Sequence, residues 1–276
     1  MDSADKKYIK DNCNNSTINN MFEHFGGKYT KTQIKNFCTN NHLAYKSLSK
    51  TERGKIIADR NKKMDYNRTQ INKDYFKIWT KNMAYVFGLW CADGCISNTS
   101  GGYYFSIKLK QSDKYLLKDI LTDMESEHKI YNKSDGSCEI NFSCKEIYND
   151  IISIGGMENK SLILKLPHIP NEYVSHFIRG YFDGDGSLNN RHTGYLIGTF
   201  EFCNSVKDIL NNNGIEISSI KQKHPENGVD NNCYCLNIFK QNEFKKFEEF
   251  MYKDVDEHTL YLKRKDARNF YESQTI

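Results

Sequence analysis

Residues 177–188 read FIRGYFDGDGSL, and this stretch decides the fold. An apolar segment with an internal glycine ends on aspartates that are each followed by glycine. Residues 85–96 read YVFGLWCADGCI and repeat this frame. The coinciding residues are the acids Asp93 and Asp185 and the internal glycines Gly88 and Gly180. The chain therefore carries the same apolar, helix-like motif twice.

Each motif opens the same order of expected elements. In the first half we expect a helix at 81–92, strands at 95–98 and 103–110, a helix at 112–124 opened by Ser112, strands at 128–132 and 138–142, and a helix opened by a Ser143/Glu146 capping box. In the second half we expect a helix at 171–183, strands at 187–190 and 195–200, a helix at 205–213, strands at 215–222 and 233–239, and closing helices. This repetition predicts an α+β fold of duplicated α-β-β-α-β-β-α halves with pseudo-twofold symmetry.

Residues 1–78 differ in character from the rest of the chain. Capping boxes at Thr30/Gln33 and Ser49/Glu52 indicate short helices, so we expect a helical, helix-turn-helix-like module and a linker. Residues 1–80 carry 16 basic and 8 acidic side chains, whereas the remainder carries 23 and 27. A basic leading segment favours a nucleic-acid partner; the alternative is a composition in which Lys and Asn are simply abundant. The main domain is expected at 79–276, with halves at about 79–166 and 167–276.

Composition limits the class of protein. The 276 residues are 38% hydrophobic and 13% aromatic, enough for a substantial core. No apolar run approaches the roughly 18 residues of a membrane span, and the polar start is unlike a signal peptide. We expect no membrane partner and an intracellular protein, in the cytoplasm or nucleoid of a host or in an organelle. Nine cysteines without C-x-x-C pairs indicate reduced thiols rather than zinc ligands.

The internal glycines and the acids predict a site. Glycine inside a helix costs about 1 kcal/mol relative to alanine, so Gly88 and Gly180 are expected to form a close helix–helix interface. Asp93 and Asp185 would then meet at one end of it. Carboxylates at helix C-termini are unfavourable and repel each other, which favours a divalent cation between them. Oxygen ligands, including the carbonyls of the glycines that follow the acids, suit Mg²⁺, with Mn²⁺ as a substitute. The metal ligands expected are Asp93, Asp185, Gly94 and Gly186.

The Asp-Gly pairs also have a simpler interpretation as turns. A single Asp-Gly after a helix is more often a tight turn than a site, but two copies in matching frames favour the metal. Metals bridged between carboxylates and a phosphate are typical of phosphodiester hydrolysis. A cation would assist, and Lys160 and Lys263 each follow the second hairpin of a half. We predict Asp93, Asp185, Lys160 and Lys263 as catalytic residues.

The strands predict a polar sheet face. In YYFSIKLK (residues 103–110), apolar and polar residues alternate, as they do in the later strands. Such a face is commonly solvated, but it can also lie in a DNA major groove. The predicted DNA contacts are Tyr104, Ser106, Lys108, Lys110, Asn141, Asn189, Arg191, Asn237 and Arg264.

These motifs resemble those of a known family. YVFGLWCADG and FIRGYFDGDGSL are similar to the paired motifs of the LAGLIDADG homing endonucleases, as are the order of GMENKSLILKLPHIPNEYVSHFIRGYFDGDGSL (156–188) and the terminal LKRK. Cys91 stands where the family frequently has aspartate, a position that is not the metal ligand. The residues at the family's metal positions are Asp93 and Asp185.

The resemblance implies a function. Single chains with two motifs act as monomers, and their two sheets form a saddle over a long, specific double-stranded DNA site. Each acid serves one strand, water attacks across the minor groove, and short 3′ overhangs result. The family's active-site lysines would correspond to Lys160 and Lys263, and Lys108 is a candidate assisting residue. The alternatives are a maturase that binds intron RNA, a regulator that binds DNA without cleaving it, and a metal-free α/β protein with duplicated turns.

Overall fold

The structure is a computed structural model that describes residues 1–46, 51, 69–189, 193–223 and 231–266. The chain forms two compact units, residues 1–68 and 69–276, which we describe separately. Residues 69–78, which we expected from the sequence to belong to the leading module, are part of the second unit. The ring of Phe76 lies 6.0 Å from that of Phe105, and the Tyr75 hydroxyl donates to Asp123.

Within residues 1–46, the described part of the first unit forms three α-helices around their own core. Its helices are α1 (Ser3–Asn12), α2 (Ile18–His24) and α3 (Lys31–Asn40). The predicted capping box opens α3, since Thr30 accepts from the Gln33 amide and the Gln33 side chain accepts from the Thr30 amide. The core consists of Ile9, Cys13, Met21, Tyr29, Ile34 and Cys38. The predicted Ser49/Glu52 cap lies outside the described residues.

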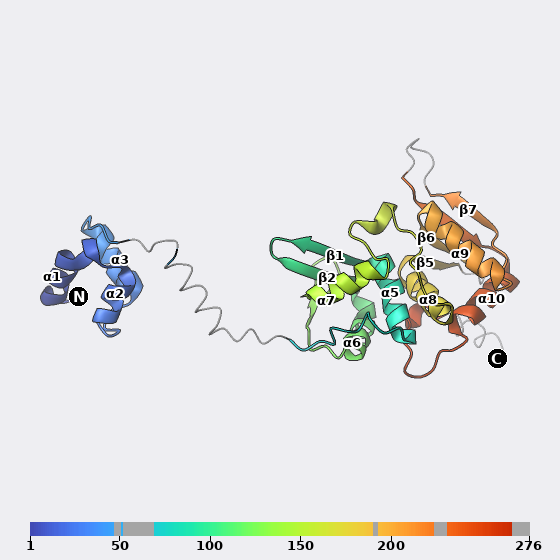
Figure 1. Ribbon diagram of the computed structural model, residues 1–276, viewed down its shortest axis with the longest axis horizontal. Helices are drawn as coiled ribbons and strands as arrows, with labels where there is room; N and C mark the ends of the chain where they lie inside the picture. The colour runs from blue at the N-terminus through green and yellow to red at the C-terminus, as the bar shows by residue number, and fades with distance from the viewer. Residues whose placement is uncertain (47–50, 52–68, 190–192, 224–230, 267–276) are drawn as a thin grey trace. The chain divides into compact units, whose positions relative to one another are not determined.

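The second unit confirms the duplicated α+β architecture (Figure 1). The first half contains α5 (Lys81–Asp93), β1 (Gly94–Thr99), β2 (Gly102–Lys110), α6 (Lys114–Asp123), β3 (Ile130–Asn132), β4 (Ser137–Ser143) and α7 (Lys145–Ser153). The second contains α8 (Val174–Asp185), β5 (Gly186–Asn189), β6 (Thr193–Gly198), α9 (Phe200–Asn212), β7 (Ser219–Gln222), β8 (Tyr234–Ile238) and α10 (Gln241–Tyr252). Short 3-10 turns include η3 (Lys160–Leu162) and η6 (Lys263–Lys265).

The two antiparallel sheets have the same topology and register. Their strand orders are β1-β2-β4-β3 and β5-β6-β8-β7. Gly94 pairs with Ile107 in the first sheet, as Gly186 pairs with Leu196 in the second. Helices bury one face of each sheet. In β2 and β4, buried residues therefore alternate with more exposed ones, because successive side chains of a strand point to opposite faces.

Three predicted helix starts are wrong. A 3-10 turn precedes α6, so Ser112 does not cap it. Helix α7 begins after Cys144 without a side-chain cap: Ser143 is the last residue of β4, and Glu146 forms an ion pair with Lys73 at 2.7 Å. Helix α9 begins at Phe200, a residue expected in a strand, because Thr199 accepts from the Phe202 amide as its N-cap.

The structure also bears on membrane-spanning helices and on disulfide bonds. Within the described part of the chain, no helix has both the length and the apolar character needed to cross a bilayer. All nine cysteines are free thiols, and six of them are buried.

Candidate active site

Helices α5 and α8 pack directly on each other at their internal glycines (Figure 1). A Cβ on Gly88 would lie 2.0 Å from the carbonyl oxygen of Phe177, and one on Gly180 would lie 2.0 Å from that of Tyr85. Only residues without a Cβ allow backbones this close. The two contacts are reciprocal, as a pseudo-twofold axis between the helices requires.

The close approach continues to the C-terminal ends of both helices. Helix α5 ends at Asp93 and α8 at Asp185. A Cβ on Gly184 would lie 2.3 Å from the Cβ of Ala92 and 3.1 Å from Oδ2 of Asp93. Gly184, which the sequence analysis did not single out, thus lets the carboxyl groups come together.

The pair of carboxyl groups is electrostatically unfavourable. Loss of hydration raises the pKa of Asp93, although the residue keeps an exposed surface. Loss of hydration, and then the charge of Asp93, raises the pKa of Asp185 to about 6. No described residue donates a hydrogen bond to either carboxylate. Nearby lysines and Arg264 oppose the repulsion without bonding to either carboxylate, so the site attracts a further cation.

Lys160 lies where the sequence predicts a catalytic cation. Its side chain is buried, and Nζ donates to the carbonyl oxygen of Gly94 and lies 5.0 Å from the ring centre of Trp90. Burial lowers its pKa, an effect that nearby thiols, Asp185 and Asp93 partly reverse.

In the second half, Lys265 occupies the equivalent position. Its Nζ donates to the carbonyl oxygen of Gly186 at 2.6 Å and to those of Gly184 and Phe182 at 3.1 Å each. The side chain is buried, and burial lowers its pKa to about 8. Each half therefore places one buried ammonium on the carbonyl of the glycine that follows its helix-terminal aspartate.

The prediction of Lys263 as the counterpart of Lys160 is corrected by this geometry. Lys263 is exposed, and its Nζ lies 4.9 Å from the ring centre of Tyr115. Successive residues of the turn η6 point in different directions: Lys263 lies on the Tyr115 ring, Arg264 pairs with Asp113, and Lys265 alone is buried at the Gly186 carbonyl. The LKRK segment contained the signal, but sequence alone does not set which lysine turns inward.

The glycines that follow the aspartates are required by neighbouring rings. A Cβ on Gly94 would lie 2.1 Å from Cδ1 of Trp90, and one on Gly186 would lie 2.3 Å from Cδ2 of Phe182. These rings flank the lysines, so ring, glycine and ammonium form one compact unit in each half. The carbonyls of Gly94 and Gly186, predicted as metal ligands, accept hydrogen bonds from the lysines.

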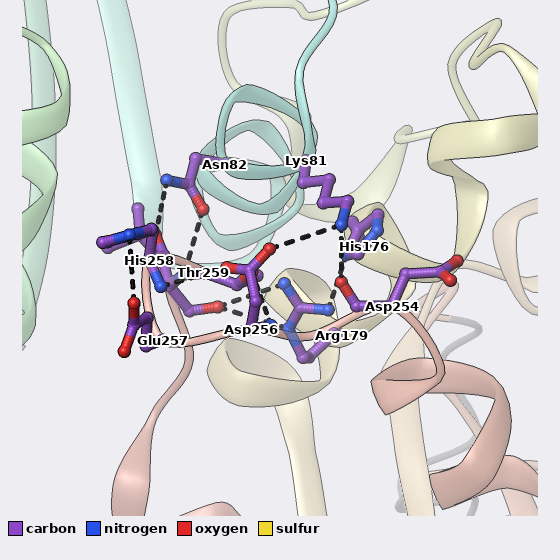
Figure 2. A network of polar contacts seen from close by, with 10 residues as sticks. Lys81, Asn82, His176, Arg179, Asp254, Asp256, Glu257, His258 and Thr259 are labelled. Atoms are coloured by element: carbon purple, nitrogen blue, oxygen red, sulfur yellow. Dashed lines mark hydrogen bonds and ion pairs between the residues drawn. The ribbon is translucent and has the colours of Figure 1, made fainter.

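Lys265 is carried by a segment that we call the C-terminal strap, residues 253–265. Figure 2 shows the strap crossing the N-terminal part of α5 and the side of α8, where Asn82 and Arg179 contact it. Arg179 is fully buried, and its guanidinium donates to the carbonyl oxygen of Leu260. The sequence does not predict the role of Arg179, because an arginine in an apolar motif carries no signal of its partners.

Asp183 has a structural role. It is buried, and Oδ2 accepts from the Tyr85 hydroxyl at 2.7 Å and from the Leu262 amide at 2.8 Å. Burial raises its pKa to about 6. Cys91, at the matching position of α5, is a buried thiol.

The donor set of the site fits a hard divalent cation. Two carboxylates without hydrogen-bond donors stand beside glycine carbonyls, so all available ligands are oxygen atoms. No group of three or more His, Cys, Asp or Glu among the described residues forms a closed metal cage. Such an incomplete shell suits Mg²⁺ or Mn²⁺, which keep waters and take phosphate oxygens as further ligands.

The first sheet presents the polar face that its strands predict. Apolar residues of β2 are buried, while Tyr104, Ser106, Lys108 and Lys110 lie on the opposite face. Asn141 of β4 is exposed on that face, where it pairs with Ser106. Lys108 donates to Asp135 at 2.7 Å in an exposed ion pair.

The second sheet and the strap modify the other predicted contacts. Asn189 is exposed, and its amide donates to Thr193. Asn237 is only 6% exposed and donates to Cys235 and Ser219 within the sheet, so it is corrected to a structural residue. Arg264 forms an ion pair with the buried Asp113 at 2.9 Å, which ties the strap to the first half. Arg191 lies outside the described residues.

Solved structures resemble the fold at low sequence identity. Mesophilic variants of the homing endonuclease I-DmoI are 18% identical with a TM-score of 0.49, covering 72% of this chain and 99% of theirs. The LAGLIDADG meganuclease I-AabMI, bound to uncleaved DNA, is 13% identical with a TM-score of 0.48, covering 71% and 90%. The I-LtrWI LAGLIDADG homing endonuclease bound to target DNA is 12% identical with a TM-score of 0.46, covering 73% and 90%.

One curated relative is much longer than this chain. It is a probable translation initiation factor IF-2 of Methanocaldococcus jannaschii, 29% identical over 178 residues. The match covers 61% of this chain but 15% of that protein.

The family model of the LAGLIDADG-like domain matches residues 80–138 and 172–252. These two regions contain both motif helices, both aspartates and most strands of the two sheets. The match therefore covers half of the chain. It includes the features that the structure repeats: helices that touch through glycine, end on aspartate and lead into sheets of identical strand order. The protein belongs to the LAGLIDADG family.

Proposed function

We propose that this protein is a site-specific, divalent-metal-dependent endonuclease that cuts both strands of DNA. The observation that carries this proposal is the pair Asp93 and Asp185, brought together without hydrogen-bond donors and flanked by Lys160 and Lys265. Proteins of this family that bind DNA without cutting it have no need for such a costly pair of acids. Retention of both acids favours an enzyme.

The twofold arrangement matches the chemistry of a duplex. The strands of DNA are antiparallel, so two symmetry-related sites can each face one scissile phosphate. The two aspartates would hold Mg²⁺ or Mn²⁺, which supplies an activated water and neutralises charge on the phosphate. Lys160 and Lys265, held on the glycine carbonyls, place a positive charge beside the developing charge of the phosphate. Attack across the minor groove leaves short 3′ overhangs.

The polar face of the first sheet supports DNA as the substrate. Tyr104, Ser106, Lys108, Lys110 and Asn141 supply donors and acceptors across neighbouring strands, and a β-ribbon fits the major groove. A single chain already contains both sites, so a monomer suffices. DNA cleavage requires the pair Asp93 and Asp185, whereas RNA binding by a maturase does not.

The leading module is proposed to bind DNA as well. Helix α3 buries Ile34 and Cys38 and exposes an opposite stripe that contains no acid; its members are Thr32, Lys35, Asn36 and Thr39. A lysine and an amide on one helix face suit phosphate contact and adenine readout in a major groove. The stripe carries no aromatic ring on which single-stranded RNA would stack. Lys35→Ala should lower duplex affinity at all sequences, whereas Lys6→Ala, on α1, should not; equal losses would contradict the assignment.

The experiment for the main proposal uses the full chain with MgCl₂. Random-sequence duplex libraries and DNA spanning the gene's own insertion point are incubated, and cut ends are mapped. Cutting at one discrete site that stops with EDTA is expected. Asp185→Asn should still retain that duplex in a gel-shift assay but not cut both strands. The proposal fails if wild type cuts none of these duplexes, and binding of intron RNA alone would favour the maturase.

A further inference from the structure

Arg179 holds two separate points of the chain that leads to the second active site. Its Nε and Nη2 donate to the carbonyl oxygen of Leu260 at 3.3 and 3.1 Å, and Nη1 donates to the carbonyl oxygen of Met251 at 2.9 Å. Met251 lies at the end of α10, and Leu260 lies within the C-terminal strap. One planar guanidinium therefore fixes both ends of the intervening segment against α8.

The same segment is also held by α5. Lys81 Nζ donates to the carbonyl oxygen of Asp254 at 2.8 Å, and Asn82 forms hydrogen bonds with the carbonyl oxygen of His258 at 3.0 Å and the amide of Leu260 at 2.9 Å. These contacts appear beside Arg179 in Figure 2. The strap thus has fixed positions on both motif helices before it reaches the aspartates.

The strap ends at the site itself. The Leu262 amide donates to Asp183, and Lys265 then reaches the carbonyl oxygen of Gly186. Arg179, Asp183 and Asp185 all lie on the rigid helix α8. The helix that presents the acid therefore also sets the position of the segment that presents the lysine.

The first half has no equivalent of this anchor. The residue that matches Arg179 in the frame of α5 is Phe87, whose ring packs on the rings of Trp90 and Phe177. Lys160 is carried instead by η3, which is outside the strap. Loss of the arginine fork should consequently disturb one of the two lysines and leave the other in place.

We propose that Arg179 is a positioning residue: through the C-terminal strap it places Lys265, and not Lys160, at its glycine carbonyl. A buried guanidinium is costly unless its donors are satisfied. Here Met251, Leu260 and the Nδ1 atom of His176, at 2.7 Å, accept its hydrogen bonds. The consequence for cleavage rests on the proposed nuclease function, but the effect on Lys265 does not.

The test is competitive labelling of lysine amines in the full chain, read by peptide mass spectrometry. In wild type, Lys265 and Lys160 are both buried and should react slowly. In Arg179→Met, Lys265 should react about tenfold faster, as expected when a lost charged hydrogen bond shifts an opening equilibrium. Labelling of Lys160 should stay unchanged. Asn82→Ala, at a half-buried position, removes other bonds to the strap and should produce a smaller change of the same kind.

The control is Ile151→Val, which trims the core of the first half without touching the strap. It lowers stability but should keep the ratio of Lys265 to Lys160 labelling at the wild-type value. An unchanged ratio in both Arg179→Met and Asn82→Ala would overturn the proposal, and if Arg179→Met does not fold, Asn82→Ala decides alone. A raised ratio in a protein that cuts no DNA would leave the positioning role intact and reject the nuclease. With active protein, the same variants should accumulate DNA nicked in one strand.

Discussion

Gly88 and Gly180 are the residues on which the close helix contact depends. A methyl group at either position would stand 2.0 Å from a carbonyl oxygen of the opposite helix. The sequence predicts this contact because glycine in an apolar helix is costly and appears at the same place in both motifs. Gly184 escapes such reasoning, since its reason is a neighbour, Ala92, that only the folded structure supplies.

We predict that Gly88→Ala and Gly180→Ala each destabilise the protein. Overpacking costs about 1–3 kcal/mol, which exceeds the roughly 1 kcal/mol gained in helix propensity. Urea unfolding should show a lower midpoint for both variants. Lys118→Ala, at an exposed position of α6, is the control and should change stability little. Wild-type midpoints for both glycine variants would mean that the helices do not meet there.

The lysine assignment makes a second prediction at this scale. Lys265→Met should reduce the single-turnover rate of DNA cleavage by about a hundredfold, the typical effect of removing one group that stabilises transition-state charge. Lys263→Met, at an exposed position two residues away, should stay close to wild type. The opposite ranking of the two variants would restore Lys263 as the catalytic residue.

Helix and strand order is the level at which the sequence is most informative. Alternation in β2 and β4 and the doubled motif predict both halves, because these strands bury one face and both motif helices are apolar. Helix starts are less predictable: Thr199 caps α9, and Phe202 and Cys203 in its first turn are buried by neighbours that are distant in the sequence. The C-terminal strap was not predictable, since its hydrogen bonds join backbone atoms to side chains far away in the sequence, such as Asn82 and Arg179.

The ends of α5 and α8 predict an unusual pH dependence. Burial and Asp93 raise the pKa of Asp185 from 3.8 to about 6, so the folded protein binds its proton more tightly than the unfolded chain. Without metal, this carboxyl group therefore lowers stability as pH rises from about 4 through 6. Asp185→Asn should raise the metal-free stability at pH 8 by about 1–2 kcal/mol and have no effect near pH 4.

Thermal unfolding at both pH values measures this effect. Asp119→Asn, at an exposed position of α6, is the matched control and should show no such difference. Added Mg²⁺ should reverse the order at pH 8, because only the wild-type carboxylates attract the cation. A metal-free Asp185→Asn protein less stable than wild type at pH 8 would contradict the electrostatic description of the site.

At the scale of the whole molecule, symmetry and asymmetry have separate consequences. The symmetric parts are the glycines, the aspartates and the buried lysines Lys160 and Lys265, which suit two equivalent cuts. The asymmetric parts are the strap with Arg179, and the polar sheet faces, which differ in sequence. A duplicated active site with unequal sheet faces is suited to a long DNA site that is not itself symmetric.

The central claim is that Asp93 and Asp185 together cut both strands of one DNA site. Its most direct test is cleavage of the mapped duplex, with each strand carrying its own label, in the presence of Mg²⁺. Wild type should cut both strands at offset positions that leave 3′ overhangs, and the Asp93→Asn/Asp185→Asn double variant should bind the duplex and cut neither. Cleavage of either strand by the double variant at the wild-type rate would contradict the account.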